Sequence, residues 1–118
     1  MTVSAQQTIP VVFDTVRAVA GASITGTFAT VGSAFAYPAR IIKVGNTTND
    51  DLEISFDGTN PHDRLPPNSF AVYDMSAAHA APGYSAMQEQ ISIYVRYLSG
   101  ETTPTGGYFY CTVIRGKF

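Results

Sequence analysis

Acidic, amide and imidazole side chains gather between residues 50 and 63, and these are side chains that could bind a cation. The group consists of Asp50, Asp51, Asp57, Asn60, His62 and Asp63. Oxygen-rich loops of this kind can hold calcium. The spacing matches no EF-hand, however, and a strand of about seven residues holds Asp51 and Asp57 near its opposite ends. We therefore interpret the group as solvated turn residues and predict no metal site.

Nucleophilic catalysis requires a base beside the nucleophile, and this chain offers few bases. Cys111 is the only cysteine, and His62 and His79 are the only histidines. None of them lies in a nucleophile elbow or a comparable motif. The acidic residues supply no recognisable pair of glycosidase carboxyl groups, and the glycines match no nucleotide-binding loop. We predict a protein that is not an enzyme, with no catalytic residues, no cofactor and a buried, inert thiol at Cys111.

Composition limits the partners that the chain can have. Of its 118 residues, 45% are hydrophobic and only 14% are charged, and the net charge is −2. Ordinary soluble domains have roughly 25% charged residues. The surface of this protein is therefore either covered by partners or made of polar residues without charge. The small negative charge supplies no basic patch, which predicts no direct binding to nucleic acid or to a membrane. The N-terminus lacks the features of a signal peptide, which predicts assembly in the cytoplasm.

Alternation with a period of two, typical of β-strands, organises the middle of the chain. Residues 39–75 contain three predicted strands joined by two turn-rich loops. In the second of these strands, residues 51–56, Leu52, Ile54 and Phe56 point toward a core while Asp51, Glu53 and Ser55 point toward water. We predict that this strand forms a hairpin with residues 40–44.

The flanking segments divide into an arm, further strands and a long loop. Residues 1–10 are polar and end in a proline, which predicts an extended N-terminal arm. Residues 11–20 are rich in β-branched side chains and predict a strand. Residues 76–86 contain Pro82 and Gly83 and predict a long surface loop. The domain plan is thus an arm, followed by a single β-sandwich domain over residues 11–118.

The last two predicted strands, residues 90–98 and 108–114, have the clearest pattern, and we predict that they form a hairpin. In the second strand, Phe109, Cys111 and Val113 face inward. Three tyrosines face outward, namely Tyr94, Tyr108 and Tyr110. Tyrosine is enriched at protein interfaces, so these are our candidate subunit-interface residues. The alternative is that they cover one another across neighbouring strands.

Short strands separated by Gly, Pro, Asn and Asp residues, with no helical periodicity, predict an all-β fold. We expect an antiparallel β-sandwich of about seven to eight strands. Jelly-roll and immunoglobulin-like topologies both fit the pattern.

One order of elements in the sequence is specific. The RII strand is followed by an Asn/Thr/Asp turn, a strand that ends in SFDG, an HD pair, and a proline-bearing loop that leads into SFAVYD. Together with FDTVRAVAGASITGTFATVG before it and QISIYVRY after it, this pattern resembles small virion proteins of tailed bacteriophages, particularly short-tailed ones. The resemblance covers roughly residues 13–114, and it implies no functional residues.

The resemblance implies a virion structural protein, with the virion as its location. Such a protein is a capsid decoration (cement) protein or a fitting near the portal or tail. For a cement protein we expect a homo-oligomer, with a trimer favoured, and contacts with the major capsid protein or other virion proteins. The alternative from another class is a carbohydrate-binding β-sandwich module, in which exposed tyrosines stack on sugar rings.

Overall fold

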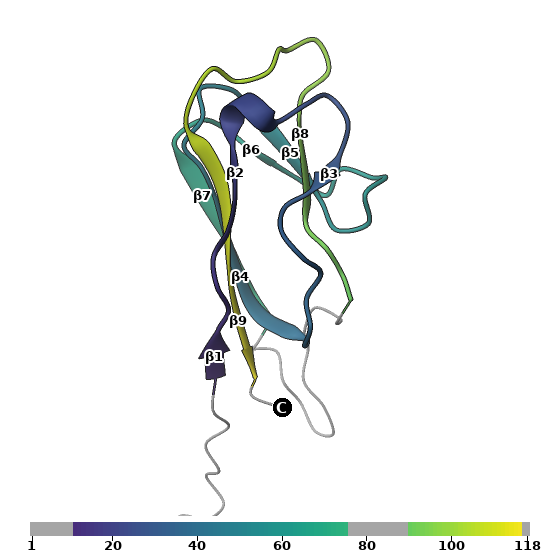
Figure 1. Ribbon diagram of the computed structural model, residues 1–118, viewed down its shortest axis with the longest axis vertical. Coiled ribbons are helices and arrows are strands. Elements are labelled where there is room, and N and C mark those ends of the chain that lie inside the picture. Colours follow the sequence, from purple (N-terminus) through teal and green to yellow (C-terminus); the bar gives the residue numbers. More distant parts are fainter. Residues whose placement is uncertain (1–10, 76–89, 117–118) are drawn as a thin grey trace, which may run out of the picture.

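The computed structural model describes residues 11–75 and 90–116, which form nine strands and one short 3-10 helix (Figure 1). The elements are β1 (Val11–Phe13), β2 (Arg17–Ala20), η1 (Gly21–Ser23), β3 (Ala29–Thr30), β4 (Ala39–Asn46), β5 (Leu52–Ser55), β6 (Asp63–Leu65), β7 (Ser69–Asp74), β8 (Tyr94–Tyr97) and β9 (Tyr108–Gly116). The predicted arm, residues 1–10, and the predicted loop, residues 76–86, lie outside the described residues.

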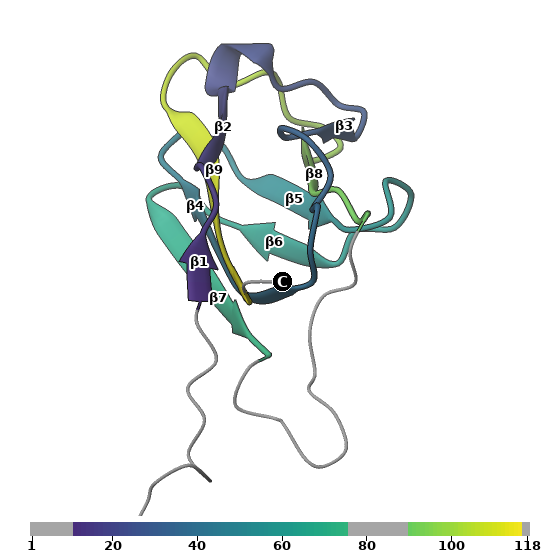
Figure 2. The ribbon, with the colours of Figure 1, turned by 60° about the horizontal axis from the view of Figure 1, so that its bottom comes forward.

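The strands form two antiparallel sheets that pack against each other, which confirms the predicted all-β sandwich. The first sheet has the order β1–β9–β4–β7, and β2 also pairs with β9. The second sheet has the order β3–β8–β5–β6. Figure 2 shows the two groups on opposite sides of the molecule.

The strand pairs are nested in the manner of a jelly roll. β5 pairs with β6, β4 with β7, β3 with β8, and the β1–β2 segment with β9, as in one long hairpin folded at its middle. β4 also pairs with β9, and β5 also pairs with β8, which completes the strand order of the two sheets. An immunoglobulin-like sandwich instead pairs its first strand with its second, so the structure selects the jelly-roll alternative.

Both predicted hairpins are wrong. β4 and β5 are consecutive in sequence but lie in different sheets, and so do β8 and β9. The loops that we interpreted as hairpin turns instead carry the chain from one sheet to the other.

The number of strands is slightly higher than predicted. The first strand is interrupted at residues 14–16, so it counts as two strands, although both parts pair with β9. β6 lies in a segment that the sequence pattern assigned to a loop.

The inward faces agree with the predicted alternation. Leu52 and Ile54 of β5 are fully buried, and so are Phe109, Cys111 and Val113 of β9. They pack in one hydrophobic cluster with residues of other strands and of the segments between them, which are Ile24, Val31, Phe35, Ala39, Ile42, Val44, Leu65, Ile93 and Val95. Each large apolar side chain buried in this way contributes about 1.5–3 kcal/mol to folding.

Candidate functional site

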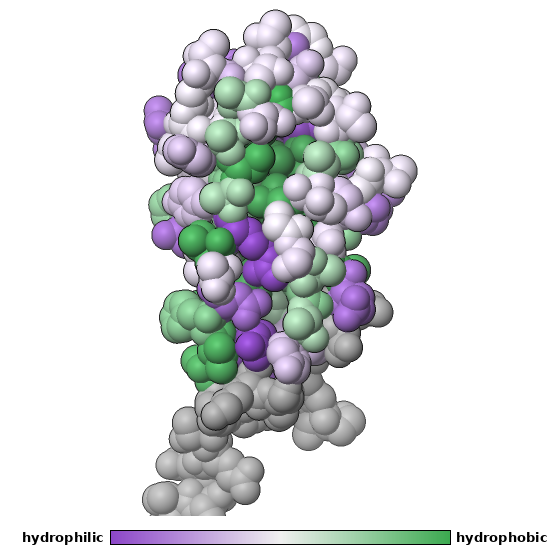
Figure 3. Space-filling view, viewed as in Figure 1, coloured by the Kyte–Doolittle hydropathy of each residue, from purple (hydrophilic) through white to green (hydrophobic). Residues whose placement is uncertain are grey.

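The outward side of the first sheet is a surface of mostly apolar residues, which we call the apolar face. Strand register and alternation place these residues on it: Val11, Phe13, Ala18, Ala20, Ile41, Lys43, Gly45, Phe70, Val72, Asp74, Tyr108, Tyr110, Thr112 and Ile114. Phe13 is 66% exposed and Phe70 is 65% exposed. Figure 3 shows hydrophobic residues at the surface where β1 lies. Most sandwiches present alternating polar residues on this side, so the apolar face is unusual.

Two of the three predicted interface tyrosines lie on the apolar face. Tyr108 is more than half exposed at one end of β9, and Tyr110 is half-buried. The Tyr110 ring lies against Gly45 on β4, because a Cβ atom at Gly45 would be only 2.1 Å from the Tyr110 Cζ atom. Phe70 is the next residue in the same row across the sheet. The glycine therefore leaves room for the tyrosine ring over β4, next to the edge strand β7 that carries Phe70.

Tyr94 lies on the other side of the sandwich. It is paired with Ser55 on β5, and its ring contacts Gly58 in the following loop. A single flat interface cannot contain Tyr94 together with Tyr108 and Tyr110. The structure thus brings two of the candidates together and separates the third.

The outward side of the second sheet has a different character. Glu53 on β5 and Arg96 on β8 are register partners, and their side chains form an ion pair of 2.8 Å. Arg64 on β6 forms another with Asp51, at 2.6 Å. The Arg96 guanidinium also lies 4.0 Å from the centre of the Phe28 ring. These ion pairs are at least partly exposed to water, so the two outer sides of the molecule differ in polarity.

The loop residues with cation-binding chemistry are engaged in local interactions with one another and with nearby backbone groups, and His62 Nε2 lies 3.8 Å from Asp57 Oδ2. The Asp57 carboxylate accepts hydrogen bonds from the backbone amides of Asn60 and Thr59, both at 2.8 Å, and these bonds hold its pKa well below the usual range. His62 Nδ1 accepts a hydrogen bond from the Phe56 amide at 3.0 Å. The Asp63 carboxylate accepts a hydrogen bond from the Tyr73 hydroxyl. Within residues 11–75 and 90–116, no three His, Cys, Asp or Glu residues are grouped so that they could hold a metal ion.

Cys111 lies in the core, and burial raises the pKa of its thiol to about 12 from an ordinary value of 9.0. The unfolded protein therefore loses this proton at a lower pH than the folded protein, so stability decreases as the pH rises above 9.0. We expect the native thiol to resist a thiol-reactive disulfide reagent until the protein unfolds.

The loss of stability at high pH caused by the buried thiol can be measured by urea denaturation of the wild type and of Cys111→Ala. The difference in unfolding free energy should shrink by about 1 kcal/mol between about pH 8 and pH 10. A thiol that reacts rapidly in the native state would contradict the burial.

Sequence reasoning missed the phenylalanines of the apolar face. In β7, Phe70 and Val72 alternate with Ala71 and Tyr73, so both sides of the strand are apolar. That pattern was a usable signal, because a strand at the edge of a sandwich normally has one polar side.

The sequence matches no protein-family model, and no curated protein matches it significantly. No helix among the described residues has the length and apolar composition needed to cross a membrane.

Proposed function

We propose that this protein is a non-enzymatic structural subunit of a bacteriophage particle, most simply a cement protein that decorates the capsid. The observation that carries the proposal is the apolar face. The resemblance of the sequence pattern to small virion proteins of tailed phages supplies the kind of particle. A fitting near the portal or tail is the alternative within the same class, and the number of copies in an intact particle distinguishes the two.

The size of the apolar face suits a protein contact. From the strand spacing and the lengths of β4 and β9, its extent in the plane of the sheet is on the order of 500 Å². The largest apolar patch on a typical monomer covers about 300–600 Å² and is often a functional surface. A stable interface buries about 800 Å² on each partner, so this face supplies most of one such contact.

The composition of the face also suits a contact that excludes water. Lys43 and Asp74 are its charged members, and the Lys43 ammonium lies 5.4 Å from the centre of the Phe70 ring. Aromatic residues are enriched and charged residues depleted in the centres of interfaces. We therefore place the contact between copies of this chain on the apolar face, with a trimer as the favoured closed assembly.

The test is a Phe70→Asp variant, which places a carboxylate at an exposed position of the apolar face, on the edge strand β7. The wild-type protein should self-associate at tens of micromolar, and the variant should raise the dissociation constant at least about a hundredfold. Size-exclusion chromatography with light scattering measures both.

Thr30→Asp is the matched control, because Thr30 is exposed on the outward side of the second sheet. It should leave the assembly unchanged. A wild-type protein that is monomeric at these concentrations would refute the homo-oligomer.

One observation favours the second candidate function, a carbohydrate-binding module. Tyr108, Tyr110 and Phe70 share the apolar face, and sugar rings stack on exposed aromatic side chains. A glycan array tests this candidate, and Tyr108→Ala should reduce any binding. An array without hits would remove the candidate.

A further inference from the structure

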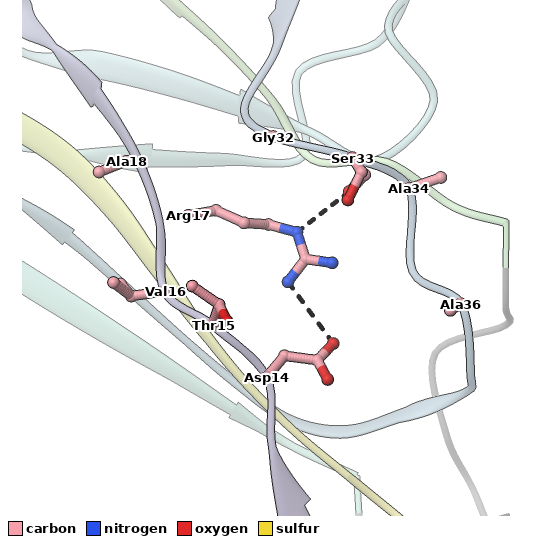
Figure 4. Close-up of a pocket in the computed structure, with 9 residues that line it drawn as sticks. All are labelled: Asp14, Thr15, Val16, Arg17, Ala18, Gly32, Ser33, Ala34 and Ala36. Carbon is pink, nitrogen blue, oxygen red and sulfur yellow. Dashed lines mark hydrogen bonds and ion pairs between the residues drawn. The ribbon is translucent and has the colours of Figure 1, made fainter.

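A pocket of about 520 Å³ lies between the two sheets at their open edges (Figure 4). Residues 14–18, in β2 and just before it, form one wall. Residues 32–34 and Ala36, in the segment that leads from β3 to β4, form the other wall. Figure 3 shows a hydrophilic band along this side of the molecule. The pocket shares only Ala18 with the apolar face, which is on the outward side of the first sheet.

Arg17 is fixed in this pocket by several contacts. Its Nε atom donates a hydrogen bond of 3.0 Å to the Ser33 carbonyl oxygen, and its guanidinium lies 5.1 Å from the centre of the Phe35 ring. The stem of the side chain passes close to Gly32, where a Cβ atom would be 2.7 Å from Arg17 Cγ. Only 9% of the Arg17 side chain is exposed. A guanidinium held in this way is preorganised, because little rotational freedom is left to lose on binding.

The charge of Arg17 is only partly balanced by the protein. The nearest carboxylate belongs to Asp14, and one of its oxygens lies 3.7 Å from Arg17 Nη1, too far for a hydrogen bond. The other oxygen accepts a bond of 2.6 Å from Arg115 Nε. Arg17 Nη1 is buried without any hydrogen-bond partner among the described residues. Figure 4 shows the remaining nitrogen, Nη2, pointing into the pocket between Ser33 and Ala36.

Buried donors without partners are costly, and in folded proteins they usually have a partner in protein, water or ligand. The Nη1–Nη2 edge of a guanidinium matches the two oxygens of a carboxylate. A doubly charged phosphate fits less well, because Asp14 already places a negative charge beside the guanidinium. The small side chains of Ala34 and Ala36 leave room for the group that carries the carboxylate.

We infer that this pocket binds a carboxylate, which accepts hydrogen bonds from Arg17 Nη2 and, after a small displacement, from Nη1. The carboxylate belongs either to a small organic acid or to an acidic side chain of a neighbouring copy of this chain. Both sources present the same chemistry to Arg17.

The Arg17 Nε–H resonance in a ¹⁵N-labelled sample gives a readout at the site, because its bond to Ser33 protects this proton from exchange. Titration with sodium acetate, at an ionic strength kept constant with chloride, should shift this resonance to saturation. The Nε–H resonance of Arg64, which pairs with Asp51 on the second sheet, is the internal control and should not saturate.

Two variants test the assignment. Arg17→Gln should weaken acetate binding at least tenfold, as measured by the acetate-dependent rise in melting temperature, whereas Arg64→Gln should leave this rise unchanged. If Arg17→Gln does not fold, Ala36→Leu serves instead. Ala36 is exposed and lines the pocket, so the larger side chain should block acetate while the Arg17 resonance is retained.

Protein concentration distinguishes the two sources. If a neighbouring copy supplies the carboxylate, dilution alone should shift the Arg17 resonance, and Arg17→Gln should weaken self-association. If the source is a free acid, the resonance should be independent of protein concentration and respond only to acetate. Two outcomes would overturn the inference. In the first, the Arg17 resonance does not change on dilution and shows no saturable shift with acetate up to about 100 mM. In the second, Ala36→Leu binds acetate as tightly as the wild type does.

Discussion

Replacing Asn46 by alanine is expected to lower the free energy of unfolding by about 3–5 kcal/mol, a large share of the stability of a domain of this size. Asn46 is fully buried at the end of β4. Its Nδ2 group donates to the carbonyl oxygens of Asp50 at 2.8 Å and Leu65 at 2.9 Å. Its Oδ1 atom accepts bonds from the Thr48 amide at 2.8 Å and the Thr48 hydroxyl at 2.6 Å. One side chain therefore satisfies four polar groups and ties β4 in the first sheet to β6 in the second.

The large effect follows from the groups that the alanine leaves behind. The Leu65 carbonyl and the Thr48 amide stay in the interior without a partner, and each such group costs about 1–3 kcal/mol. Urea denaturation followed by circular dichroism measures the loss.

Asn49→Ala is the matched control, because Asn49 is exposed and its Oδ1 atom accepts one bond, of 3.0 Å, from the Thr105 amide. The control should lose less than about 1 kcal/mol, since water can replace that bond. Equal losses in the two variants would show that the buried network does not connect the sheets energetically.

Gly107→Ala is expected to destabilise the protein by at least about 3 kcal/mol. Gly107 has a φ of +78°, and a Cβ atom there would lie 2.1 Å from the Thr47 carbonyl oxygen. A backbone atom cannot rotate away as a side chain can. The Thr47 amide donates to the Tyr108 carbonyl oxygen at 2.8 Å, so displacing this segment also disturbs the neighbouring Asn46 network.

Gly106→Ala, one position earlier, is a close control. A Cβ atom at Gly106 meets nothing within 4 Å, and we expect a change within about 0.5 kcal/mol. Thermal and urea denaturation of both variants measure the difference. A Gly107→Ala protein as stable as Gly106→Ala would contradict the close approach of the two backbone segments.

The candidate site was only partly predictable. The outward direction of Tyr108 and Tyr110 followed from the alternation in β9, because neighbouring side chains on a strand point to opposite sides. The same rule predicted that Tyr94 points outward, but it could not show that β8 belongs to the other sheet. The role of Arg17 was equally unpredictable from the sequence. Its neighbours Ser33 and Phe35 come close to it only when the segment between β3 and β4 folds.

The sequence by itself determined the class of the fold and the inward side of its most regular strands. Leu52, Ile54, Phe109 and Val113 are buried as their alternation predicts, because side-chain direction along a strand is a local property. The choice of partner strands was decided only by the tertiary structure. Backbone donors and acceptors are the same in every strand, so they do not select one partner strand over another. The glycine, asparagine and proline residues of a loop indicate a change of direction, but not whether the chain pairs with the preceding strand or crosses to the other sheet. β4 instead pairs with β7 and β9, and the nested arrangement packs apolar residues from both sheets in one core while the apolar face stays outside.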